Sequence, residues 1–269
     1  MKQVDIIIFG GQSNMQGQSD RLSECEEVAN AYEYKQLTDS FVPLKNPTGE
    51  DIRYDGGAGV TYGLSGVDAD GWRRDHVLGA ACYGHTNLLP AFCRAYLAKG
   101  DVPVIAIHAA KGATELAAWL PGSEGYAALL KKAKAGIEKA KTQYEIRRIT
   151  FVWLQGESDA LACKSAAYYR GNLVLFGEAL QKELGLQLFA VIRVGRFAGD
   201  ARDEEIIAAQ EEVCRTHPLF RMLTDCTERL NKTPASMNPH APGHYSAAGY
   251  EELGNAAGHA LAAYFLTEK

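Results

Sequence analysis

Short apolar runs alternate with longer amphipathic segments along most of this chain, and no other feature restricts its fold as strongly. Five runs are short and almost continuously apolar, as buried strands are: Val4–Phe9, Val102–His108, Arg148–Leu154, Leu186–Val194 and Phe220–Thr224. Five longer segments between or after them are candidate helices: Leu88–Lys99, Tyr126–Lys141, Ser165–Leu184, Asp203–Thr216 and Ala247–Leu266. Strands that are apolar on both sides are typical of a parallel sheet covered on both faces. The sequence therefore predicts an α/β fold, a three-layer sandwich around a central parallel sheet.

The chain has 269 residues and shows neither an internal repeat nor a linker. This length suits one α/β domain spanning residues 1–269. The segment 16–85 is the irregular part, because it is rich in Gly, Asp and Tyr and lacks a clean period. We expect long loops there, with one short helix, lying over the functional site.

Composition excludes several classes of protein. Apolar residues make up 46% and charged residues 23%, which is ordinary for a soluble globular protein. The net charge is −5 and no long basic run occurs, so a nucleic acid is not an expected partner. No apolar run is long enough to span a membrane. The six cysteines have neither C-x-x-C nor zinc-ligand spacing, so we expect free thiols, no metal and a reducing, cytoplasmic location.

A serine follows the first predicted strand directly, in the sequence Gly10-Gly11-Gln12-Ser13-Asn14-Met15. A serine at the carboxyl end of a strand can project its hydroxyl into a cleft. The backbone N–H groups that open the next helix can then stabilise an oxyanion. The alternative is a serine that only caps a helix. The segment is not the G-x-S-x-G elbow, because Met15 occupies its last position, and it lacks the G-x-G-x-x-G spacing of a dinucleotide site.

Polar residues also follow the third predicted strand, in the sequence Gln155-Gly156-Glu157-Ser158-Asp159. The carboxyl ends of parallel strands share one edge of the sheet, where ligands bind. Gln155 could donate its amide N–H into a cleft there, and Glu157 could anchor neighbouring groups. The alternative is a pair of acidic residues placed to suit a helix N-terminus.

A histidine precedes the last predicted helix, in the sequence His240-Ala241-Pro242-Gly243-His244. A single histidine is more often a packing or surface residue than a catalyst. A serine early in the chain and a histidine late is one of the orders in which hydrolases assemble a nucleophile and its base.

These three clusters resemble the motif blocks of SGNH hydrolases, whose fold is flavodoxin-like. The blocks are Gly-Gln-Ser-Asn-Met at 11–15, Gln-Gly-Glu-Ser-Asp at 155–159 and His-Tyr-Ser-Ala-Ala-Gly-Tyr at 244–250. More narrowly, they resemble the branch that holds sialate O-acetylesterases and acetylxylan esterases. The stretch Ala109–Thr114, with Trp119, is similar to a loop of that branch.

The resemblance implies a role for each matching residue. Ser13 would attack an acetyl carbonyl, and His244 would be its general base. The Ser13 N–H, the N–H of Gly84 and the Gln155 side chain would hold the oxyanion. Substrate-binding residues would be Gln12, Asn14, Glu157 and Lys111, and other cleft-lining candidates are Tyr62, Trp72 and His85.

One position departs from the family's pattern. The usual Asp three residues before the catalytic histidine is Ala241 here, and no acidic residue lies between Asn231 and His244. Loss of an orienting acid can lower the rate by about four orders of magnitude. Three possibilities remain open: another carboxylate substitutes, a backbone carbonyl holds His244, or the protein is a weakened relative. The carboxylates considered are Asp225, Glu228 and Glu157.

The resemblance thus implies a serine esterase that deacetylates a carbohydrate and needs neither a metal nor an organic cofactor. The expected partner is an acetylated saccharide, and the oligomeric state is left open. The principal alternative is a relative without activity that binds sugars, and another is an esterase acting on a non-sugar acyl ester. Turnover of an acetyl ester that depends on Ser13 would distinguish an enzyme from a binding protein.

Overall fold

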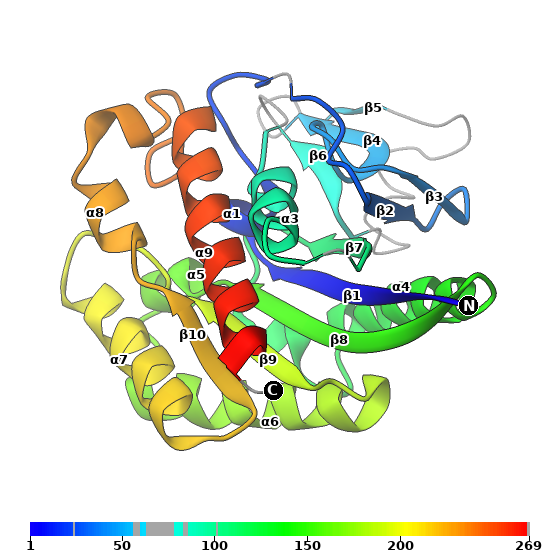
Figure 1. The fold of residues 1–269 in the computed structure, drawn as a ribbon. Coiled ribbons are helices and arrows are strands. Elements are labelled where there is room, and N and C mark those ends of the chain that lie inside the picture. Colours follow the sequence, from blue (N-terminus) through cyan, green and yellow to red (C-terminus); the bar gives the residue numbers. More distant parts are fainter. Residues whose placement is uncertain (24, 56–59, 63–77, 83–85, 101, 268–269) are drawn as a thin grey trace.

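The computed structural model describes residues 1–23, 25–55, 60–62, 78–82, 86–100 and 102–267 (Figure 1). Its main sheet has seven strands, all parallel to their neighbours except the last, which pairs antiparallel. Their order across the sheet is β10 (Phe220–Thr224), β9 (Leu188–Ile192), β8 (Tyr144–Leu154), β1 (Lys2–Gly11), β7 (Val104–Ala110), β2 (Ala31–Lys35) and β3 (Ser40–Pro43). The prediction of an α/β fold around a mostly parallel sheet is confirmed.

Helices cover both faces of this sheet, which explains why its central strands are apolar throughout. Ile6 and Ile8 of β1 point into one apolar core, and Ile7 and Phe9 point into the other. The first core lies under α4 (Glu124–Lys141), α6 (Ala166–Leu184) and α7 (Ala201–Thr216). The second lies under α3 (Leu89–Leu97) and α9 (Ala247–Thr267), which cross the front of the sheet in Figure 1.

The irregular segment holds more regular structure than its composition predicts. The structure adds β2 and β3 to the main sheet and forms a second sheet from β4 (Glu50–Asp55), β5 (Val60–Tyr62) and β6 (Ala80–Cys82). The expectation of long loops is therefore wrong for these strands. Strand β2 does not stand out as an apolar run in the sequence because it contains Glu33 and Lys35. These two side chains are buried and form an ion pair of 3.0 Å.

Short helices connect the larger elements on the side where β1, β7 and β8 end. They are α1 (Ser13–Gln16), the 3₁₀ helix η1 (Leu116–Trp119), α5 (Glu157–Leu161), α8 (Thr227–Asn231) and the 3₁₀ helix η2 (Pro234–Ser236). Within the described part of the chain, no helix is long and apolar enough to span a bilayer. The same residues contain no group of three or more His, Cys, Asp or Glu side chains arranged to hold a metal ion. The five cysteines with described side chains are free thiols.

Candidate active site

The three central strands end at one level, and this brings the polar segments together. Gly11 at the end of β1 pairs with Ala110 of β7 on one side and with Leu154 of β8 on the other. Ser13 and Gln155 follow β1 and β8 directly. Gly11 itself has φ +143°, and a Cβ there would lie 2.0 Å from the Leu154 carbonyl oxygen. Only glycine fits at this crowded turn.

Ser13 and His244 form a hydrogen-bonded pair although 231 positions separate them in the chain. His244 Nε2 lies 2.8 Å from Ser13 Oγ. The Ser13 residue is only 5% exposed, and His244 is half-buried. Ser13 opens α1, and His244 lies on the loop before α9. This is the contact that a serine nucleophile needs with its general base.

A backbone carbonyl orients the imidazole. His244 Nδ1 lies 3.3 Å from the carbonyl oxygen of Ala241, which also accepts the His244 backbone N–H at 3.1 Å. Pro242 and Gly243, the latter with φ +80°, occupy the central positions of this four-residue turn, as a type II turn prefers. With Nδ1 donating its proton to the carbonyl, Nε2 is the unprotonated nitrogen that faces Ser13. Ala241, at the usual Asp position, thus accepts this hydrogen bond with its main-chain carbonyl instead of a side-chain carboxylate.

The three carboxylates considered from sequence are engaged elsewhere or lie apart. Glu228 pairs with Arg193 at 2.8 Å and with Lys232 at 3.0 Å. Glu157 accepts a hydrogen bond from Asn14, and Asp225 is exposed at the end of β10. Among the residues that the structure describes, no carboxylate contacts His244.

Partial burial lowers the pKa of His244 below its ordinary value of 6.5, because desolvation penalises the charged ring. The carbonyls of Ala241 and Pro242 act in the opposite direction but are outweighed. Phe197 contributes to this setting, since its ring packs edge-on against the imidazole at a centroid distance of 5.5 Å. His244 is therefore neutral, and competent as a base, at neutral pH.

Asn14, next to Ser13, connects its own motif segment with the other two. Its Nδ2 donates to Glu157 Oε1 at 2.8 Å and to the Gly243 carbonyl at 3.1 Å. Its Oδ1 accepts the Tyr250 hydroxyl at 3.1 Å. Asn14 is 2% exposed, as is Glu157, whose pKa is raised mainly by burial. Asn14 and Glu157 are therefore buried and bonded to other motif segments, which favours a supporting role over the predicted contact with a substrate.

Gln155 and Gln12 are buried in the same way. Gln155 Nε2 lies 2.6 Å from Asp159 Oδ2, 2.9 Å from the Thr114 carbonyl and 3.2 Å from Gln12 Oε1. Its Oε1 accepts the Tyr169 hydroxyl at 2.8 Å. An amide has two N–H hydrogens, and protein acceptors take both. The geometry therefore gives Gln155 a positioning role and leaves no hydrogen for the predicted oxyanion contact. Gln12 shares this role and does not line an open surface.

The backbone offers two oxyanion donors. In the described part of the chain nothing accepts the Ser13 N–H. Gly84, the second donor predicted from sequence, lies outside the described residues. Gly112 is a candidate that the sequence reasoning missed: a Cβ there would lie 3.5 Å from Ser13 Cβ, and its N–H donates to Gln16 Oε1 at 2.8 Å. The position of Gly112 just after β7, which pairs with β1, could have indicated it as a candidate.

A cavity of about 300 Å³ lies in the region that follows β7. Lys111 lines it together with Leu78, Thr114, Ala118, Trp119, Ser123, Glu124 and Gly125. Lys111, a predicted substrate-binding residue, lines this cavity, and burial lowers the pKa of its ammonium group. Trp72 and His85 lie outside the described residues, as does the side chain of Tyr62.

Three solved structures share this fold. The structure of NanS is similar with a TM-score of 0.69 at 12% identity, covering 100% of this chain and 99% of that one. A protein of Arabidopsis thaliana matches with a TM-score of 0.62 at 16% identity over 98% of both chains. A carbohydrate acetylesterase from Xanthomonas citri matches with a TM-score of 0.51 at 17% identity, covering 96% of this chain and 55% of that one.

At these identities the structural matches show a shared fold. No curated protein matches the sequence. The family model described as "Carbohydrate esterase, sialic acid-specific acetylesterase" matches residues 3–263, nearly the whole chain. The chain therefore belongs to this family of carbohydrate esterases.

Proposed function

We propose that this protein is a serine esterase that hydrolyses O-acetyl esters of a saccharide, with Ser13 as nucleophile and His244 as general base. The observation that carries the proposal is the 2.8 Å contact between Ser13 Oγ and His244 Nε2. A capping serine has no need of an unprotonated imidazole on its hydroxyl. Family membership supports the saccharide ester as substrate class.

In the first step His244 Nε2 takes the proton of Ser13 as Oγ attacks the acetyl carbonyl carbon. The carbonyl oxygen becomes an oxyanion, and we propose that it binds the Ser13 N–H and the Gly112 N–H in place of Gln16 Oε1. His244 then gives its proton to the sugar oxygen as the C–O bond breaks. The sugar leaves with a free hydroxyl, and the acetyl group remains on Ser13.

In the second step a water molecule attacks the acetyl-serine, and His244 removes a proton from that water. Collapse of the second tetrahedral intermediate returns the proton to Ser13 and releases acetate. Throughout both steps the developing positive charge on the imidazole is stabilised by the carbonyls of Ala241 and Pro242, and a neutral carbonyl is a weaker partner than a carboxylate.

The cavity at Lys111 supports a substrate larger than the acetyl group. It combines apolar walls with two charged side chains, Lys111 and Glu124, and Lys111 precedes Gly112 in the chain. Such a mixture suits a sugar ring, which has apolar C–H faces and a rim of hydroxyls. A sialic acid ester and a xylan-type acetyl ester are the two substrates that the family resemblance suggests.

The test is turnover of 4-nitrophenyl acetate and of acetylated saccharides by the wild type, Ser13→Ala and His244→Ala. We expect each replacement to reduce kcat by at least about three orders of magnitude without changing the melting temperature by more than a few degrees. Ser40→Ala, on the distant edge strand β3, is the matched control and should keep wild-type turnover. A serine-reactive phosphonate should label Ser13 and no other serine.

Wild-type turnover by Ser13→Ala would exclude this mechanism. Binding of acetylated saccharides by a wild type that never hydrolyses them would establish the sugar-binding alternative. Activity on simple acyl esters, with no preference for any acetylated sugar, would favour the non-sugar esterase.

A further inference from the structure

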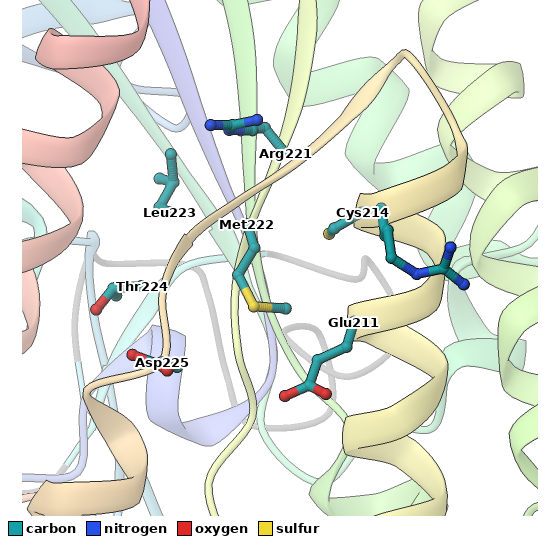
Figure 2. A pocket seen from close by; sticks show the side chains of 8 residues that line it. Glu211, Cys214, Arg221, Met222, Leu223, Thr224 and Asp225 are labelled. Atoms are coloured by element: carbon teal, nitrogen blue, oxygen red, sulfur yellow. The ribbon is translucent and has the colours of Figure 1, made fainter.

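The outer edge of β10 has no partner in the described part of the chain, and a groove runs along it. β10 is the end strand of the main sheet and pairs only with β9. A cavity of about 430 Å³ lies against it (Figure 2). It is lined by residues of α7, of β10 and of the position after β10: Glu211, Cys214, Arg215, Arg221, Met222, Leu223, Thr224 and Asp225. Proteins usually guard an open edge, because its unpaired N–H and C=O groups attract other strands. The opposite edge strand, β3, ends in Pro43, which cannot donate such a bond.

The charges along this groove are ordered from one end to the other. Arg221 lies near the start of β10 and Asp225 directly after its end, and Figure 2 shows them at opposite ends of the strand. Both side chains are exposed, and neither forms an ion pair with any described residue. Helix α7 has the same order of charges, since the exposed Arg215 lies in its last turn and Glu211 one turn earlier. Glu211 itself pairs with Arg193 at 2.8 Å.

The middle of the groove is less polar. Leu223 lies midway between Arg221 and Asp225, and it belongs to the apolar core under α9. Met222 and Cys214 pack against the core on the α7 side. Positive charge at one end, apolar surface in the middle and negative charge at the other end form a pattern that complements itself after a half-turn rotation.

We propose that a second copy of this chain docks on β10, with the two strands antiparallel about Leu223 and the molecules related by a two-fold axis. In this register Arg221 faces the partner's Asp225, and Asp225 faces the partner's Arg221. Arg221 and Leu223 lie on the face that α9 covers, since the Arg221 guanidinium lies 5.8 Å from the centre of the Tyr264 ring and Leu223 belongs to the core under α9. The register between β10 and β9 is irregular between Met222 and Thr224, so the pairing of Arg221 with Asp225 rests on their opposite charges and not on a strict alternation of faces. Glu211 already pairs with Arg193 at 2.8 Å, so the complementary charges across the interface are those of Arg221 and Asp225. A parallel arrangement would instead bring like charges together.

A two-fold dimer of this kind joins two seven-stranded sheets into one continuous sheet. It leaves the carboxyl ends of β1, β7 and β8 uncovered, because β10 lies at the side of the sheet. The inference rests on the edge strand and its charges and does not depend on the proposed catalysis. The strand has only five residues, so we expect association in the micromolar range and not a permanent dimer.

The test is sedimentation velocity of the full chain at concentrations from about 1 to 200 μM, for the wild type, Arg221→Glu and Asp225→Arg. The wild type should show a reversible monomer–dimer equilibrium. Each single variant opposes like charges twice, so we expect dimerisation about tenfold weaker or more. Lys131→Glu, an exposed charge reversal on α4, is the matched control and should dimerise like the wild type.

An equimolar mixture of Arg221→Glu and Asp225→Arg gives the sharpest readout. In a heterodimer of the two variants both cross-strand pairs again join opposite charges, so association should return. Circular dichroism establishes that the variants are folded. A wild type that stays monomeric up to 200 μM would overturn the proposal. So would a dimer unaffected by either charge reversal, or single variants that fail to associate with each other.

Discussion

At the scale of single residues, the site differs from a Ser–His–Asp triad at one atom. The acceptor of the His244 Nδ1 proton is a main-chain carbonyl, whereas a carboxylate would carry a full charge. The carbonyl fixes the tautomer, which is the part of the acid's role that determines whether the base can work at all. It stabilises the imidazolium less well, and it raises the pKa of His244 too little to offset burial.

The expected pH dependence follows from this balance. A histidine whose pKa is lowered stays deprotonated at lower pH, so kcat/KM should rise with pH through a midpoint below the ordinary 6.5. Ala241→Asp would place a carboxylate beside Nδ1, which should increase kcat and move the midpoint to higher pH. Glu228 pairs with Arg193 and Lys232 and not with His244, so Glu228→Gln should leave kcat and the midpoint unchanged. A pH–rate profile of the three proteins checks this, and equal midpoints for wild type and Ala241→Asp would contradict it.

At the scale of elements, close helix packing holds the loop that carries His244. Helix α9 follows that loop and lies on α3 with two glycines at the contact. A Cβ on Gly254 would lie 2.5 Å from the Leu88 carbonyl oxygen, and one on Gly258 would lie 2.2 Å from that of Phe92. The backbone of α3 cannot move aside as a flexible side chain could, so the two helices approach this closely only because these positions lack side chains.

We therefore expect Gly258→Ala to destabilise the protein by about 1–3 kcal/mol, the cost of overpacking. Gly171→Ala is the matched control, because Gly171 lies in α6 and a Cβ there meets nothing within 4 Å. That change should stabilise the protein by about 0.4–1 kcal/mol through helix propensity and a less flexible unfolded chain. Urea unfolding of both variants measures this. Equal effects of the two changes would show that the α3–α9 contact is looser than the structure indicates.

The same elements show what the sequence could and could not predict. The buried parallel strands and their helices follow from apolar periodicity, and α6 lies between its N-cap Ser165 and its C-cap Gly185, close to the predicted bounds. The pairing of Ser13 with His244 was suggested by motif order. The Ala241 carbonyl was not identifiable, because every residue has a carbonyl and only the turn aims this one. Strand β2 was missed because its buried residues include Glu33 and Lys35, and a charge in the interior has no apolar signal.

At the scale of the whole molecule, a buried ionic cluster attaches the segment after β2 to the sandwich. Lys132 of α4 is fully buried and donates to Glu50 at 2.6 Å and to the Leu78 carbonyl at 2.9 Å. Glu33 accepts the Gly49 N–H at 2.7 Å, and Lys35 donates to the Gly49 carbonyl. Removing one member of such a cluster leaves another charge buried alone, so the cluster stabilises this arrangement over alternatives in which its charges are separated.

His108 lies beside this cluster and makes stability depend on pH. It is fully buried, its Nδ1 is 3.5 Å from Thr48 Oγ1, and its Nε2 has no partner among the described residues. Burial, with the nearby charges of Lys132 and Lys35, lowers its pKa from 6.5 to about 3. Between these values the unfolded chain binds a proton that the folded protein does not. The free energy of unfolding should therefore fall as pH decreases below 6.5, approaching about 1.4 kcal/mol per pH unit for this one group.

A substitution isolates this contribution from the other titrating groups. His108→Gln keeps a polar side chain of similar size but cannot take up a proton, so its stability should depend less on pH than that of the wild type. Glu33, whose pKa is raised by burial, acts in the opposite direction but is present in both proteins and cancels in the difference. Urea unfolding at pH 7, 6 and 5 should show the wild type losing stability faster than the variant. Parallel stability curves would mean that the pKa of His108 is not lowered in the folded protein, which would contradict the prediction.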